Sequence, residues 1–128
     1  MKNLQISDND LFGNRFNGHD LHFYLREKGI ESNQLVWQKR SQDPYTFEIA
    51  RNIENRYKLN VEATSLHKIF NSHANLYPFS YSLFFDPLFL EADIIHYHLI
   101  HNYFFNIFHL PMLAKLKPSV WTLHDPWA

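Results

Sequence analysis

The residues best suited to chemistry lie near the end of the chain, where His124 and Asp125 follow a short apolar run, residues 120–123. The β-branched and aromatic character of that run predicts a buried strand. In open α/β sheets, ligands bind in the crevice beyond the carboxyl ends of the strands. Imidazole titrates near neutrality, so His124 is able to donate, accept or orient a proton there. The alternative is a turn at Asp125, with His124 as a buried polar residue.

A second group of candidates is the histidine set His96, His98 and His101. On a strand, His96 and His98 point to the same face and His101 follows shortly after, so a zinc site is one interpretation. The chain has no cysteine, and the nearest carboxylate in sequence is Asp93. Strand-end histidines in an α/β fold more often point into a substrate crevice or bond to the backbone. We therefore expect no metal site, and stoichiometric zinc binding in a calorimetric titration would contradict this expectation.

A third group lies in the glycine-containing loop at residues 12–18, which leads into a predicted helix. Free backbone N–H groups at a helix start attract anions such as phosphate. Gly13 and Gly18 permit a ligand to approach the backbone, and Arg15 supplies a cation. Neither a dinucleotide-binding glycine pattern nor a Walker pattern is present. A plain turn with Asn17 as the helix cap explains the loop equally well.

The elements that must position these residues follow the order of a doubly wound α/β fold. Strands are predicted at residues 4–7, 35–37, 93–98 and 120–123, and helices at residues 17–28 and 103–116. Gly29 is a normal stop for the first helix. Two βαβ units in one short chain predict a Rossmann-like, mostly parallel sheet with flanking helices, in a single domain over residues 1–128.

The middle of the chain has a weaker pattern. Residues 79–92 predict a packed helix that Pro87 interrupts or bends. Two further helical faces are predicted before it, one from Phe47, Ala50 and Ile53 and one from Leu66, Ile69 and Phe70.

Composition excludes several classes of function. Twelve basic and thirteen acidic residues give a net charge of −1, whereas nucleic-acid binding requires a basic face. Without cysteine there is no disulfide framework and no thiolate chemistry. The sequence shows no signal peptide, and no stretch approaches the roughly 20 apolar residues that span a bilayer. The aromatic segment 103–110 lacks the basic face of a membrane-surface helix, so core packing is favoured there. No nucleophile elbow is present, so acyl-transfer hydrolysis is not supported.

Three blocks of the sequence resemble the amino-terminal domain of the group 1 (family 4) glycosyltransferases, retaining enzymes of the GT-B fold. The blocks are FGNRFNGHDL at residues 12–21, with Leu25 and Gly29, ADIIHYHLIHN at residues 92–102, and KPSVWTLHDPW at residues 117–127. The resemblance implies transfer of a sugar from a nucleotide-sugar donor to a glycan or glycolipid acceptor, with retention at the anomeric carbon. It implies no cofactor beyond the donor and no obligatory metal. We expect a cytoplasmic location, with peripheral contact with the inner face of the cell membrane as the open alternative.

The resemblance also assigns roles to individual residues. His124 matches the histidine that faces the reacting sugar, and is the candidate catalytic residue. His98 matches the strand-end histidine of the middle block, with a positioning or structural role. Gly13 matches the loop glycine that approaches the donor phosphates or the acceptor, while Asn14 stands where many members have a second glycine. The candidate substrate-binding residues are Gly13, Asn14, Arg15, His98 and Asp125.

In this family a second Rossmann domain binds the nucleotide, and the sequence contains no second unit of that kind. We therefore expect a donor-binding domain or chain as partner, and no sugar transfer by this polypeptide alone. The alternative is a non-catalytic binding module that pairs with a separate donor-binding chain. A parallel sheet needs both faces covered, so we expect self-association or low stability without a partner.

Overall fold

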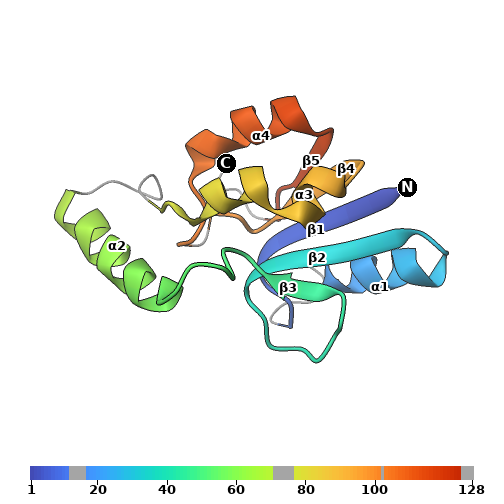
Figure 1. The fold of residues 1–128 in the computed structure, drawn as a ribbon, viewed down its shortest axis with the longest axis horizontal. Helices are drawn as coiled ribbons and strands as arrows, with labels where there is room; N and C mark the ends of the chain where they lie inside the picture. The colour runs from blue at the N-terminus through green and yellow to red at the C-terminus, as the bar shows by residue number, and fades with distance from the viewer. Residues whose placement is uncertain (12–16, 71–76, 102, 125–128) are drawn as a thin grey trace.

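The structure is a computed structural model built around a five-stranded, all-parallel sheet with helices on both faces (Figure 1). It describes residues 1–11, 17–70, 77–101 and 103–124. The strand order is β3-β2-β1-β4-β5, so the chain moves outward from β1 first on one side and then on the other. This order confirms the predicted Rossmann-like α/β fold. The strands are β1 (Lys2–Asn9), β2 (Glu31–Gln38), β3 (Thr46–Glu48), β4 (Ile94–His98) and β5 (Ser119–Thr122).

The helices form two layers and one projecting arm. In Figure 1, α1 lies on one side of the sheet, α3 and α4 lie on the other, and α2 extends away to the left. Among the described residues, no helix has the length and hydropathy needed to cross a bilayer. The helices are α1 (His19–Glu27), α2 (Arg56–Phe70), α3 (Pro87–Glu91) and α4 (Leu110–Leu116), with 3₁₀ helices η1 (Phe79–Phe85) and η2 (Ile107–His109).

The two faces of the sheet differ sharply in chemistry. The face toward η1, α3 and α4 is apolar and contributes Leu4, Ile6 and Tyr97 to the core, where they meet Phe89 and Leu113. The face toward α1 is polar although it is buried. Its side chains come from neighbouring strands in register, for example Gln5 opposite both Gln34 and His96. Parallel sheets are normally apolar on both faces, so this polar face requires an explanation.

The polar face is stabilised by side-chain hydrogen bonds between β1, β2 and α1. Gln34 Oε1 lies 2.8 Å from His19 Nδ1, and Gln34 Nε2 donates to the Asn17 carbonyl at 3.0 Å. Buried polar groups are tolerated where they find such partners. The polar side chains buried on this face include Asn3, Gln5, Ser7, Ser32, Gln34, Thr46 and His98.

The predicted helical face at Phe47, Ala50 and Ile53 is wrong. Phe47 lies in β3, opposite Leu35 of β2, and the Ile49 N–H continues the ladder to the Val36 carbonyl at 2.7 Å. Ala50 then turns the chain with a φ of 54°. The three-residue spacing of these apolar side chains fits a short strand and its turn as well as a helix. The second predicted face, around Leu66 and Ile69, does lie on a helix, α2.

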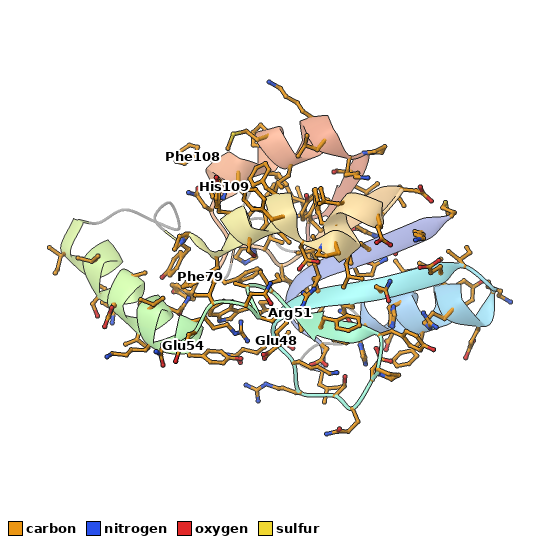
Figure 2. The ribbon with its side chains drawn as sticks, in the orientation of Figure 1. Glu48, Arg51, Glu54, Phe79, Phe108 and His109 are labelled. Carbon is orange, nitrogen blue, oxygen red and sulfur yellow. The ribbon has the colours of Figure 1, made fainter. Side chains whose placement is uncertain are left out.

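Two other helices are shorter than the sequence predicted. Residues 79–92 form η1 and then α3, separated by the extended residue Asp86, so Pro87 starts a helix rather than bending one. Residues 103–106 are not helical, and the side chain of Asn106 accepts from Phe108 N–H where η2 begins. Phe104 and Phe105 are fully buried, which confirms core packing for them, whereas Phe108 lies exposed at the rim beside His109 (Figure 2).

Candidate functional site

Two histidines from separate blocks of the sequence meet at the carboxyl ends of β4 and β5. His98 is the last residue of β4 and lies in register with Thr122, the last residue of β5. His124 follows two residues later, and its Nε2 lies 3.2 Å from His98 Nδ1. The ring planes are 18° apart and the centroids are 5.5 Å apart, farther than the two nitrogens, so the rings meet edge to edge. The structure thus brings together His98 and His124 at the carboxyl ends of neighbouring strands, the edge at which ligands bind in such sheets.

Gln5 completes a row of three polar side chains. Its Oε1 lies 2.7 Å from His98 Nε2, and its Nε2 donates to Asn3 Oδ1 at 2.5 Å. Gln5 is fully buried and His98 is 3% exposed, so water does not replace either bond. Sequence reasoning missed Gln5. The signal was the alternation of polar and apolar residues in β1, which places Gln5 on the same face as the β4 histidines.

Gly18 closes the row from the side of α1. It has a φ of 82°, and a Cβ atom at this position would lie 2.7 Å from His98 Nε2 and 2.8 Å from Gln5 Oε1. The loop after β1 therefore ends directly against the end of β4, which is where the strand order reverses. The Asn17 side chain accepts from His19 N–H at 3.0 Å and so bonds to the first residue of α1, but the cap position of the helix is Gly18 and not the predicted Asn17.

His96 lies on the same sheet face, with its ring centroid 4.0 Å from that of His98. Its Nε2 is 2.6 Å from Thr122 Oγ1, which ties β4 to β5. Within the described part of the chain, no three histidine, aspartate or glutamate side chains are arranged to hold a metal ion, the set His96, His98 and His101 included.

Burial determines the charge state of the two β4 histidines. Burial, with smaller contributions from the neighbouring His96 and His124, lowers the pKa of His98 to about 3. Burial also lowers the pKa of His96, with a smaller contribution from His124. His98 is therefore neutral at physiological pH, with one donor nitrogen and one acceptor nitrogen.

Four of the candidate substrate-binding residues lie outside the described residues. They are Gly13, Asn14 and Arg15 in the loop after β1, and Asp125 beside His124.

A second polar group, at the amino-terminal half of β2, is fully buried. His22 Nδ1 lies 3.0 Å from Ser32 Oγ, and His22 Nε2 lies 3.2 Å from Asp43 Oδ2. Burial lowers the pKa of His22 despite the opposing effect of Asp43. Burial raises the pKa of Asp43, but hydrogen bonds from Thr46 and Tyr45, with the neighbouring His22, outweigh it and leave the pKa lowered. Ser32 and His22 have no exposed surface, so this group stabilises the packing of α1 rather than meeting a substrate.

A pocket of about 450 Å³ lies at the carboxyl ends of β1 and β2, on the side covered by α2. This volume is within the usual range for a small-molecule site. Asn60 of α2 donates to the Tyr103 carbonyl at 2.5 Å and joins α2 to the segment after β4. The pocket is lined by Asp8, Trp37, Gln38, Asn60, Thr64, Lys68 and Tyr103.

No family model, curated protein or solved structure matches this chain. The geometry of the site and the chemistry of its residues are therefore the basis for a functional interpretation.

Proposed function

We propose that this chain is the acceptor-side domain of a retaining glycosyltransferase, which moves a sugar from a nucleotide-sugar donor to a glycan or glycolipid acceptor. The observation that carries the proposal is the meeting of Gly18, His98 and His124 at the point where the strand order reverses. Each of these residues comes from one of the three blocks that resemble that family. Ligand sites in doubly wound sheets form at this reversal.

His124 is the residue we propose to contact the reacting sugar. It is partly exposed, while its partner His98 is buried, so His124 is the histidine of this pair that a ligand reaches. A neutral imidazole accepts a proton from a sugar hydroxyl, and a protonated one donates to it. The start of α1, which lies against His98 at Gly18, offers partial positive charge to donor phosphates.

The pocket beside α2 is the proposed place for the acceptor. Trp37 and Tyr103 supply aromatic rings, and Asn60 and Thr64 supply amide and hydroxyl groups. A few polar groups placed among aromatic walls are typical of sites for small polar ligands.

Ligand titrations followed by NMR test the proposal. Titration with a panel of nucleotide sugars should shift the ring signals of His98 and His124 and the amide signal of Gly18. The variant His124→Asn should weaken binding about tenfold, which is about 1.4 kcal/mol. The matched control His109→Asn, on the opposite face of the sheet, should bind as the unchanged protein does. Nucleotide sugars that leave the signals of Gly18, His98 and His124 unchanged would overturn the proposal.

A transfer assay separates the enzyme from the binding module. Sugar transfer is measured by mass spectrometry for the chain together with its donor-binding domain or chain, with and without His124→Asn. Product that is formed by the complex and lost with His124→Asn supports the transferase. Tight binding by a complete complex that forms no product supports the non-catalytic module and overturns the transferase.

A further inference from the structure

We propose that α1 opens from the sheet as one unit while the rest of the fold stays intact, and that this opening gives a ligand access to Gln5 and His98. Both side chains are otherwise covered, since Gln5 is fully buried and His98 is 3% exposed. Gly18, at the start of α1, lies directly against both of them. The proposal concerns access to this part of the site, and it holds whichever ligand binds there.

The contact between α1 and the sheet contains no part of the hydrophobic core. Only two residues of α1 are buried, and both are histidines, His19 and His22. Leu21 and Leu25 are partly buried, but within the described part of the chain no residue of α1 belongs to the core or packs against it. On the opposite face, α3 and α4 each contribute a fully buried side chain to the core.

Polar bonds attach α1 to the sheet instead. His19 Nδ1 lies 2.8 Å from Gln34 Oε1. His22 Nδ1 lies 3.0 Å from Ser32 Oγ, and Arg26 Nη1 donates to the Ser32 carbonyl at 2.8 Å. Water replaces such bonds when the groups become exposed, so their net contribution is small, whereas exposed apolar surface finds no such replacement. We therefore infer that α1 separates from the sheet more readily than α3 and α4.

Detachment from the sheet would melt α1. The helix has nine residues, and an isolated helix of that length is not stable in water. Its amides would lose protection together, including His22 N–H, which donates to the Gly18 carbonyl at 2.8 Å. Segments with few buried apolar contacts are the ones that open below the free energy of global unfolding. The same opening removes the Gly18 backbone from the ring of His98 and so exposes the end of β4.

Native-state hydrogen exchange of the ligand-free protein tests the opening. We expect the amides of α1 to share one opening constant, about tenfold or more above that of the amides in β1 and β4. This constant should depend only weakly on urea, because opening of one short helix exposes little surface. The proposal is wrong if α1 has the same opening constant as β1 and β4. Graded rates along α1, which indicate fraying rather than detachment, would also contradict it.

Two matched serine variants distinguish local opening from global unfolding. Ser32→Ala removes a bond to His22 that exists only while α1 is attached, so it should raise the opening constant of α1 about tenfold. Ser80→Ala removes a bond of 2.8 Å to His109 on the opposite face, which the open form retains. It should accelerate exchange in β1 and β4 and leave α1 unchanged. Equal acceleration of α1 by both variants would show that α1 opens only with the whole fold.

A third variant keeps the test decisive if Ser32→Ala does not fold. Arg26→Gln changes a partly exposed side chain and removes the bond to the Ser32 carbonyl. It should also raise the opening constant of α1, by a smaller factor. A folded Arg26→Gln protein in which exchange of α1 is unchanged would contradict attachment through these polar bonds.

Carbethoxylation of histidines, kept to low levels and mapped by mass spectrometry, tests access to the site. His22 has no exposed surface and His98 has 3%, so both should react through the opening of α1. Ser32→Ala should accelerate both reactions about tenfold, and Ser80→Ala should leave both unchanged. Reaction at His98 that does not follow reaction at His22 would show that α1 is not the route to His98. Failure of nucleotide sugars to bind is a separate outcome, since it removes the proposed function and leaves these rates as they are.

Discussion

The backbone of Gly18 lies so close to the ring of His98 that a Cβ atom at position 18 would come within 2.7 Å of Nε2. The backbone φ of 82° also belongs to the region that favours glycine. Both constraints act on one residue, so the start of α1 and the end of β4 are fitted to each other. Any side chain at position 18 must displace the ring that supports His124.

Gly18→Ala should therefore destabilise the protein through strain and collision together. The positive φ costs about 1–2 kcal/mol and overpacking against a buried ring adds about 1–3 kcal/mol. Urea denaturation followed by circular dichroism measures the sum. Gly29→Ala is the matched control, because Gly29 has a φ of 78° and nothing within 4 Å of the added atom. Equal losses for the two variants would contradict a collision at Gly18.

The neutral, buried His98 predicts a loss of stability in acid. Its folded pKa of about 3 lies below its ordinary value of 6.5, so between those pH values only the unfolded chain binds the proton. Stability contributed by this group is complete above pH 6.5 and falls as the pH decreases toward 3. One proton corresponds to a slope of about 1.4 kcal/mol per pH unit.

His98→Asn should remove about that slope from the dependence of unfolding free energy on pH, measured by urea denaturation from pH 4 to pH 7. Burial also lowers the pKa of His109, which is only half-buried, so His109→Asn should change the slope less. An unchanged slope in His98→Asn would show that His98 is not held neutral in the fold.

Removal of the hydroxyl group should change the free energy of unfolding differently at two buried tyrosines on the apolar side of the sheet. Tyr77 OH lies 3.0 Å from Thr64 Oγ1, whereas Tyr97 OH is buried with no hydrogen-bond partner among the described residues. Ser119 is the nearest candidate partner and lowers the pKa of Tyr97 slightly, but the two side chains do not meet in hydrogen-bond geometry, and Ser119 Oγ donates to the Lys117 carbonyl at 2.8 Å. Burial raises the pKa of Tyr97, so its hydroxyl stays protonated.

Tyr97→Phe should leave the unfolding free energy unchanged or raise it by up to about 1 kcal/mol, while Tyr77→Phe should lower it by about 1 kcal/mol. Thermal and urea denaturation of the two variants, side by side, measures the difference. A loss in Tyr97→Phe as large as that in Tyr77→Phe would indicate a hydrogen bond to the Tyr97 hydroxyl.

Four of the five strands were predictable from the sequence because each contains apolar or β-branched residues between turn signals, alternating with polar residues in β1. The core of every predicted strand lies on an observed one, and Gly29 ends α1 as predicted, with a φ of 78°. Phe47 was misassigned because three residues of strand pairing carry too little periodicity to distinguish them from one helical turn. The 3₁₀ helix before Pro87 was missed because apolar content alone does not distinguish the two helix types.

The site was predictable only in part, because its residues are distant in sequence. Strand-end position indicates His98 and His124, but their contact depends on β4 and β5 being neighbours, which only the assembled sheet shows. Gln5 is 93 residues from His98 and belongs to no motif. Its contact with His98 depends on the register between β1 and β4, which places Gln5 directly opposite His96.

Substitutions of Asp86 should lower the stability of the protein by graded amounts, because its carboxylate has two separable roles. Its carboxylate caps α3 by accepting from Leu88 N–H at 2.9 Å, and it pairs with both terminal nitrogens of Arg51 at 2.6 Å and 3.3 Å. Figure 2 places Arg51 beside Glu48, whose carbonyl also accepts from it, so this pair ties β3 to the helical layer. Asp86 is 8% exposed, so loss of the pair leaves Arg51 without a buried partner.

Asp86→Ala removes both roles and should cost about 2–4 kcal/mol, whereas Asp86→Asn keeps a capping oxygen and should cost about 1–2 kcal/mol. The control is Glu91→Ala, which breaks an exposed ion pair with Lys2 and should change little. Urea denaturation of the three variants measures the order. Equal losses in Asp86→Ala and Asp86→Asn would assign the whole effect to the ion pair and none to the cap, since the asparagine retains the oxygen that Leu88 N–H requires.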